Sequence, residues 1–273
     1  PDRSDVAEIV GRAMFNLSGL HLSEGNYRVA QELAVRALTF YENALSINPD
    51  NERLQLGLAN TLNVLGIIEL NYGDLQEAFT HFNTGHTLLG RLLKQSPDRP
   101  DYLQSQATMA ISKGVAMRLL GNSQGELRSY EEALAAYRSL GKALPDVPQF
   151  NEDTALTLTD MGQLYIQSMQ LKKAGVVLNE AYATFKELAI EDGENLRYVE
   201  EFATTSEALS RTHFYLGDRN RAIELITEAN ELFGKLSTAA PEIVQYRYRY
   251  ALGLLLAANI DSSTATADEY MNQ

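Results

Sequence analysis

Cysteine and tryptophan are absent from this 273-residue chain, and only four histidines occur in it. The absence of cysteine excludes disulfides, thiolate metal sites and a cysteine nucleophile. Two of the histidines, His81 and His86, fall in one predicted helix but stand five residues apart. Metal ligands on a helix need a spacing of about three or four residues to share one face, so we expect no metal site.

Basic residues are also fewer than acidic residues. The chain has 23 basic and 36 acidic side chains, and its formal net charge is −13. An acidic surface repels the phosphates of nucleic acids and of anionic membranes, so neither is expected as a partner. No apolar run approaches the roughly 20 residues of a membrane helix, which predicts no membrane insertion.

Motifs that carry chemistry are missing as well. The sequence contains no glycine-rich phosphate loop and no combination of nucleophile, base and orienting residue, so it predicts neither an enzyme nor a cofactor site. The chain begins at Pro1, without an initiator methionine or a signal-peptide profile, which favours a fragment of a larger protein. The lack of cysteine fits a reducing, cytoplasmic location.

What the sequence does contain is a period of 48 residues that runs along the chain without insertion or deletion. Small residues recur in one register at Ala37, Gly85, Ala133, Ala181 and Ala229, and in a second at Ala59, Ala107, Ala155, Ala203 and Ala251. Bulky residues accompany the first register at Tyr41, Leu89, Tyr137, Phe185 and Phe233. Turn positions recur at Gly25, Gly73, Gly121, Met169 and Gly217. A fixed period is the signature of a stacked repeat protein.

Each period contains two helical stretches. In the second period, apolar residues follow one another at steps of three or four from Asp50 to Tyr72 and again from Asp74 to Lys94. Gly73 separates the two stretches, because glycine tolerates the left-handed backbone found just past a helix end, and Pro97 ends the second stretch. No segment alternates as a half-buried strand does, so the sequence predicts an all-α fold.

These residues resemble the tetratricopeptide repeat. The second period reads Leu65-Gly66, Ala78, Phe82 and Gly85, and the fourth reads Met161-Gly162, Tyr165, Ala174, Leu178 and Ala181. Ordinary repeats of this family take about 34 residues, and the extra residues here lengthen both helices equally. The resemblance implies one domain over residues 1–273, a right-handed superhelical solenoid of antiparallel helix pairs with five full repeats plus one further helix. The repeats fall at about 2–49, 50–97, 98–145, 146–193 and 194–241, with a partial repeat at 242–273.

Long repeats of this kind resemble those of bacterial multidomain signalling proteins. The resemblance therefore implies a scaffold, within a larger bacterial signalling or regulatory protein, that binds a peptide or protein segment in a concave groove of the first helices. The family's groove positions fall on Arg12, Phe15, Asn60, Asn63, Asn71, Thr108, Ile111, Arg118, Thr159, Gln163, Gln167, Thr204, Glu207, Arg211 and Tyr215. Amide side chains satisfy peptide backbone groups and arginine pairs with carboxylates, which favours a polar or acidic segment as the partner.

A structural role is the alternative. Leu252, Leu254 and Leu255 belong to a last helix without a predicted partner helix. End repeats of solenoids normally carry a polar outer face, and an apolar flank in that position predicts a homo-oligomer formed through the terminal helix.

Overall fold

The computed structural model describes residues 3–271, with the side chains of Val6 and of residues 8–260. The described part of the chain is all-helical and contains eleven helices and no strand. They are α1 (Arg3–Ser23), α2 (Tyr27–Ile47), α3 (Glu52–Tyr72), α4 (Leu75–Gln95), α5 (Pro100–Leu119), α6 (Ser123–Ala143), α7 (Gln149–Gln167), α8 (Leu171–Glu191), α9 (Leu196–Tyr215), α10 (Arg219–Ala239) and α11 (Val244–Met271). The predicted all-α fold of helix pairs is therefore confirmed.

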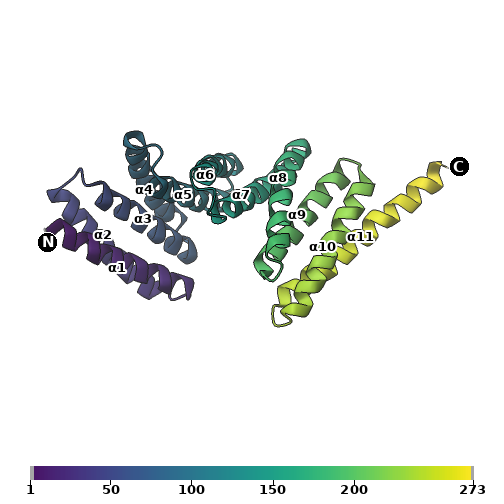
Figure 1. The fold of residues 1–273 in the computed structure, drawn as a ribbon, viewed down its shortest axis with the longest axis horizontal. Coiled ribbons are helices and arrows are strands. Elements are labelled where there is room, and N and C mark those ends of the chain that lie inside the picture. Colours follow the sequence, from purple (N-terminus) through teal and green to yellow (C-terminus); the bar gives the residue numbers. More distant parts are fainter. Residues whose placement is uncertain (1–2, 272–273) are drawn as a thin grey trace. The chain divides into compact units, whose positions relative to one another are not determined.

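The helices gather into two compact units, α1–α6 up to Val147 and α7–α11 from Pro148 (Figure 1). Within each unit consecutive helices pack on one another, and α1 also contacts α3, α3 contacts α5, and α7 contacts α9. The second helices of the five pairs start at residues 27, 75, 123, 171 and 219, each 48 residues after the one before. The predicted single domain over 1–273 stays a prediction.

The turn inside each pair contains one residue in the left-handed region, and in three of the pairs a side-chain cap of the second helix follows it. Gly25, Gly73, Gly121 and Gly217 have φ between 72° and 84°, and Met169 has φ 57°. Side chains in the next position cap the second helix: Asp74 accepts from the Glu77 N–H at 3.1 Å, Asn122 from Gly125 at 2.9 Å, and Asp218 from Arg221 at 3.3 Å. The repeated turn position in the sequence therefore marks where the backbone needs a positive φ.

The two small registers lie where helices meet. All members of the first are buried, as are the bulky residues beside them. Four members of the second are buried, but Ala251 is exposed, because no described helix pair follows α11 to cover it.

Within a pair, a small residue on the first helix faces a large residue on the second helix. A Cβ added to Gly66 would overlap the Phe82 ring, one added to Gly114 would lie 2.8 Å from Tyr130, and one added to Gly162 would overlap Leu178. Two pairs carry serine at this position instead, and Ser18 and Ser210 each donate at 2.7 Å to a main-chain carbonyl of the second helix. Glycine opposite a large side chain lets the two backbones approach closely.

Met169 is the one described non-glycine residue with a positive φ, and its side chain is 64% exposed. The left-handed region costs a residue with a Cβ about 1 kcal/mol, while Met169 has little burial to lose. We expect Met169→Gly to stabilise the chain by about 0.5–1 kcal/mol, measured by urea unfolding followed by circular dichroism.

Gly73→Ala is the matched control, because a Cβ at Gly73 meets no atom within 4 Å and only the backbone strain remains. It should destabilise the chain by about 1 kcal/mol. A Met169→Gly variant that unfolds at lower urea than the parent would show that the turn is not strained.

Candidate functional site: a groove on the first helices

Two adjoining cavities, of about 460 and 330 Å³, lie on the first helices of the first unit. Both are lined by Phe15 of α1, Leu56 and Asn60 of α3, and Asp101 of α5. Predicted groove residues contribute to one or both: Arg12, Phe15, Asn60, Asn63 and Thr108. We call this surface the α1–α3–α5 groove.

Tyr41 reaches the groove from the second helix α2. Its ring passes between two glycines: a Cβ on Gly11 of α1 would lie 2.8 Å from the ring, and one on Gly57 of α3 would overlap it. Tyr41 is buried yet lines the larger of the two cavities. Burial, and then the nearby Glu8, raises the pKa of Tyr41 to about 12, against a smaller lowering by Arg12. The phenol is therefore protonated at neutral pH and offers a hydrogen-bond donor to the groove.

The other basic residues of the same cavity are engaged by carboxylates. Arg99 contacts Glu52 at 3.1 Å and Asp101 at 2.6 Å, and its hydrogen bond holds the pKa of Asp101 below the usual value. Arg53 lies 3.8 Å from Glu8 of α1. Arg12 has no ion-pair partner among the described side chains.

The smaller cavity contains an amide without a full set of partners. Asn63 of α3 is only 8% exposed, and its Oδ1 has no hydrogen-bond donor among the described residues. A buried acceptor left unpaired costs about 1–3 kcal/mol. The oxygen itself has less than 1 Å² of accessible surface, so a ligand in the cavity does not reach it.

The remaining predicted residues of the first unit lie outside the two cavities. Asn71 is at the end of α3, where its side chain donates to the Ile67 carbonyl at 2.8 Å. Arg118, at the end of α5, lies 3.8 Å from Glu126 of α6. Ile111 is half-buried on α5.

In the second unit, several predicted residues interact with side chains of neighbouring helices. Thr159 of α7 is 3% exposed, and its Oγ1 lies 3.1 Å from that of Thr205 on α9, so it offers no free surface. Arg249 of α11 pairs with Glu207 at 3.1 Å and donates to Thr204 at 3.4 Å. The others differ in exposure: Gln163 and Arg211 are half-buried, and Gln167 and Tyr215 are exposed.

In the second unit, burial raises the pKa values of acidic residues on α7 and α9. Glu152 lies 2.7 Å from Arg197, yet burial raises the pKa of Glu152 more than this guanidinium lowers it. Burial and the neighbouring Glu200 raise the pKa of Glu201 from 4.5 to about 7. Adjacent acids such as these look solvated in the sequence, so only the packing reveals the shift.

Several lining residues were not predicted from the sequence. Leu56 stands one helical turn before Asn60, and Gln104 one turn before Thr108, so extending the groove positions by four residues would have found both. Tyr41 carries no such signal, because its register is otherwise a core register.

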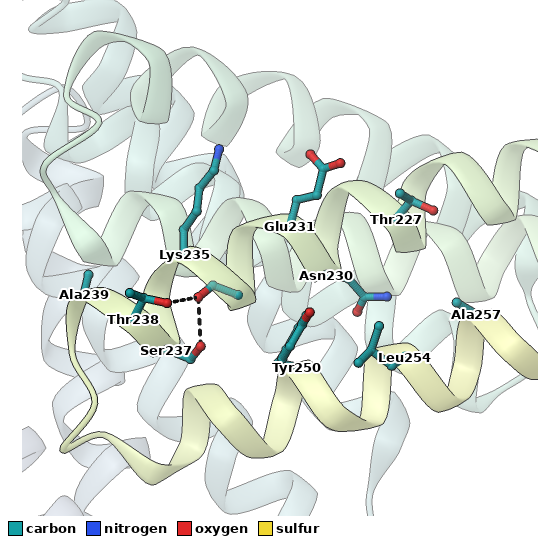
Figure 2. A pocket seen from close by; sticks show the side chains of 11 residues that line it. Thr227, Asn230, Glu231, Lys235, Ser237, Thr238, Ala239, Tyr250, Leu254 and Ala257 are labelled. Carbon is teal, nitrogen blue, oxygen red and sulfur yellow. Dashed lines mark hydrogen bonds between the residues drawn. The ribbon is translucent and has the colours of Figure 1, made fainter.

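A further cavity, of about 950 Å³, lies between α10 and α11 (Figure 2). Tyr250 and Leu254 of α11 face Asn230 of α10 across it. Leu254 is 48% exposed, whereas its counterparts Leu62 and Leu158 in two earlier pairs are 6% and 1% exposed beneath their own second helices. The cavity therefore lies beside a leucine register that earlier pairs cover with their own second helix.

No cluster of three or more histidine or acidic side chains among the described residues has the geometry of a metal site. Among the same residues, no helix is long and apolar enough to cross a membrane.

Solved structures with the same fold are tetratricopeptide-like repeat proteins. BtubC (BKLC) from P. vanneervenii superposes with a TM-score of 0.64 at 16% identity, over 85% of this chain and 82% of that one. The putative kinesin light chain TPR-like repeats from Podosopora anserina give 0.58 at 17% identity, over 84% and 97%. A STAND protein with a tetratricopeptide repeat sensor, from Pyrococcus horikoshii, gives 0.65 at 13% identity, over 96% of this chain but 36% of that one.

These likenesses define the class of the fold, a tetratricopeptide-like helical repeat, as the sequence motifs imply. No protein-family model matches the chain, and no curated protein sequence matches it either.

The raised pKa of Glu201 predicts a pH-dependent stability. The folded state binds the Glu201 proton more tightly than the unfolded state does. Protonated Glu201 therefore contributes fully to the stability of the fold below about pH 4.5, and this contribution is lost as the pH rises through 7. We expect Glu201→Gln to be more stable than the parent by about 2 kcal/mol at pH 8, and to match it near pH 4.5.

Urea unfolding across this pH range measures the effect, with Glu231→Gln on the exposed face of α10 as the control. Equal pH profiles for Glu201→Gln and the parent would show that Glu201 ionises without cost in the fold.

Proposed function

We propose that the chain is a protein-interaction scaffold that binds an extended segment of a partner protein in the α1–α3–α5 groove, and that it has no catalytic role. The observation that carries the proposal is the joining of two cavities over three first helices, lined by five residues of the predicted set. An open surface that combines apolar side chains with amides and hydroxyls suits a peptide chain, because the amides and hydroxyls can satisfy its backbone groups.

The surrounding context belongs to the same proposal. One structural neighbour carries its tetratricopeptide repeats as the sensor of a signal-transduction ATPase, and the chain covers 36% of that protein. We place this chain in a comparable setting, as the interaction part of a larger bacterial signalling or regulatory protein in the cytoplasm. The net charge of −13 argues against nucleic acid and anionic membranes as partners.

A groove-filling substitution tests the binding surface. Asn60 lines both cavities, so Asn60→Trp places a large ring where the segment would lie. Peptides are first selected from a random displayed library on the parent protein, and their affinities are then measured by fluorescence polarisation. We expect Asn60→Trp to weaken binding about tenfold or more.

Gln76→Trp adds the same ring to an exposed position of α4 and should leave the affinity unchanged. The proposal fails if Gln76→Trp releases the peptides while Asn60→Trp retains them, because the binding surface would then lie on the second helices.

Self-association is the second candidate function, and the exposed apolar flank of α11 favours it. Val244, Tyr248, Leu252 and Leu255 are between 42% and 65% exposed and recur at helical spacing. Monomeric proteins rarely expose a continuous apolar patch of this kind.

Light scattering coupled to size-exclusion chromatography distinguishes this role from a monomeric scaffold. If α11 mediates self-association, the double variant Leu252→Glu with Leu255→Glu should convert an oligomer into a monomer. Val176→Glu, which alters an exposed apolar residue of α8, should not do so. A parent protein that is already a monomer at high concentration rules this role out.

A further inference from the structure

Helix α11 is a first helix in the same register as those of the earlier pairs. It starts at residue 244, which is 48 residues after the start of α9. Tyr246 of α11 donates to Glu200 of α9 at 2.9 Å. Tyr102 of α5 donates to Glu52 of α3 at 2.7 Å in the same way. Each residue of α11 therefore has an equivalent, 48 residues or a multiple of 48 earlier, in the other first helices.

One stripe of α11 is exposed although its equivalents are buried. It consists of Tyr250, Ala251, Leu254 and Ala258, and we call it the α11 stripe. The four equivalents of Ala251 in α3, α5, α7 and α9 are 0% exposed. A surface that earlier pairs bury is therefore open on α11, and the cavity between α10 and α11 lies beside it.

In an earlier pair, the second helix of that pair covers this stripe. A Cβ on Gly85 of α4 would lie 3.1 Å from the Ala59 carbonyl and 3.5 Å from Leu62. Those two residues of α3 are the equivalents of Ala251 and Leu254. No described residue covers α11 in this way, because α11 runs on without a turn to its last described residue.

Three second helices share a pattern on the face that covers a first helix. A large residue is followed two positions later by glutamate and then directly by alanine, and a second large residue stands four positions after the alanine. The pattern falls at 130–137 in α6, 178–185 in α8 and 226–233 in α10. Its large residues and alanines are buried in all three helices. The pattern thus describes the kind of helix that fits the stripe of a first helix.

The glutamate of this pattern bonds to neighbouring helices. Glu132 of α6 accepts from Gln106 of its own first helix at 2.6 Å, and it lies 2.6 Å from His86 of the preceding second helix. The equivalents of Gln106 and His86 are Tyr250 of α11 and Asn230 of α10, which both line the cavity (Figure 2). The Tyr250 hydroxyl has no hydrogen-bond partner among the described residues. A donor for such a glutamate is therefore present and free.

A second copy of the chain does not offer a helix of this kind. The three helices with the pattern are packed inside their own units, and their large residues are buried. The described side chains of α11 include no glutamate, and their only charges are those of Arg247 and Arg249. The α11 stripe therefore suits a helix of a different protein.

We propose that the α11 stripe and the cavity beside it bind an amphipathic helix of a partner protein, which packs where a sixth pair has its second helix. The partner helix carries the pattern of α6, α8 and α10. Its small residue faces Ala251 and Leu254, its first large residue faces Ala258, and its glutamate accepts from the Tyr250 hydroxyl. The inference goes beyond the proposed groove function, because no residue of the α1–α3–α5 groove belongs to this surface.

The probe is a fluorescein-labelled peptide with the sequence of α6, which carries the pattern and is rich in strong helix formers. Fluorescence anisotropy measures its binding to the full chain, and we expect the binding to be saturable. A peptide with Glu132→Gln should bind about tenfold more weakly, because a charge-assisted hydrogen bond is lost. A peptide with Ala133→Leu keeps its helix propensity but should not bind, because a large residue then meets Ala251 and Leu254.

Substitutions on α11 test the same contacts from the protein. Tyr250→Phe should bind the unchanged peptide and the Glu132→Gln peptide equally, because the donor to the glutamate is missing. Leu254→Glu should lose both peptides, since it places a charge in the packing surface. Leu252→Glu is the matched control: it puts the same charge on the other exposed flank of α11 and should keep the affinity of the parent. Circular dichroism melting of each variant confirms that the fold is retained.

Three results would overturn the inference. If the Ala133→Leu peptide binds as tightly as the unchanged peptide, or if neither binds, the stripe does not take a helix of this pattern. If Tyr250→Phe still prefers glutamate to glutamine, the contact with the hydroxyl is wrong. If the parent is an oligomer that Leu254→Glu dissociates and the peptide does not bind, a second copy covers the stripe.

The groove function is tested separately. Asn60→Trp fills the α1–α3–α5 groove but should bind the α6 peptide as the parent does. Loss of this peptide from Asn60→Trp would place the helix in the groove and not on α11, which contradicts the inference.

Discussion

The close approach of the two helices in each pair is the constraint on which the rest of the structure depends. Gly66, Gly114 and Gly162 on the first helices face Phe82, Tyr130 and Leu178 on the second. A helix pair with a large residue on both sides could not close, and one with small residues on both sides would contain a cavity. This match fixes the register between the helices, and the register in turn decides which side chains of the first helix face outward to form a groove.

The same packing of glycine against a large side chain forms the floor of the groove. Gly11 and Gly57 leave space for Tyr41, which comes from α2 and would otherwise remain in the core. The structure thus gains a rigid hydroxyl donor at the groove from a core position, at the cost of two glycines inside helices. Glycine within a helix is worth about 1 kcal/mol less than alanine, so the close packing must offset a real loss of helix stability.

Neighbouring pairs are linked by polar contacts that recur at a nearly constant sequence separation. Glu132 lies 2.6 Å from His86 and accepts from Gln106 at 2.6 Å in the first unit. At the matching position of the second unit, Glu228 accepts from the Tyr182 hydroxyl at 2.8 Å. Each of these contacts joins a pair to the next pair of the same unit, which is the nearest-neighbour coupling expected of a repeat protein.

The sequence by itself determined the period, the helix pairs and the turn position, because each depends on local backbone preferences and on the spacing of small and apolar residues. Even Met169 follows the rule of its register and adopts a positive φ. The resemblance to the tetratricopeptide repeat also predicted Arg12, Asn60 and Asn63 as groove residues, and the structure shows that all three line the two cavities.

Only the tertiary structure decided which outward side chains remain available. Thr159 and Glu207 share registers with groove residues, but Thr205 and Arg249 on the neighbouring helices occupy them. The neighbouring helices also decide that Arg12 has no ion-pair partner among the described side chains and that Tyr41 reaches the groove. The contacts of a side chain depend on which residue of the next helix lies opposite it and at what distance. The sequence of a single repeat does not contain this information.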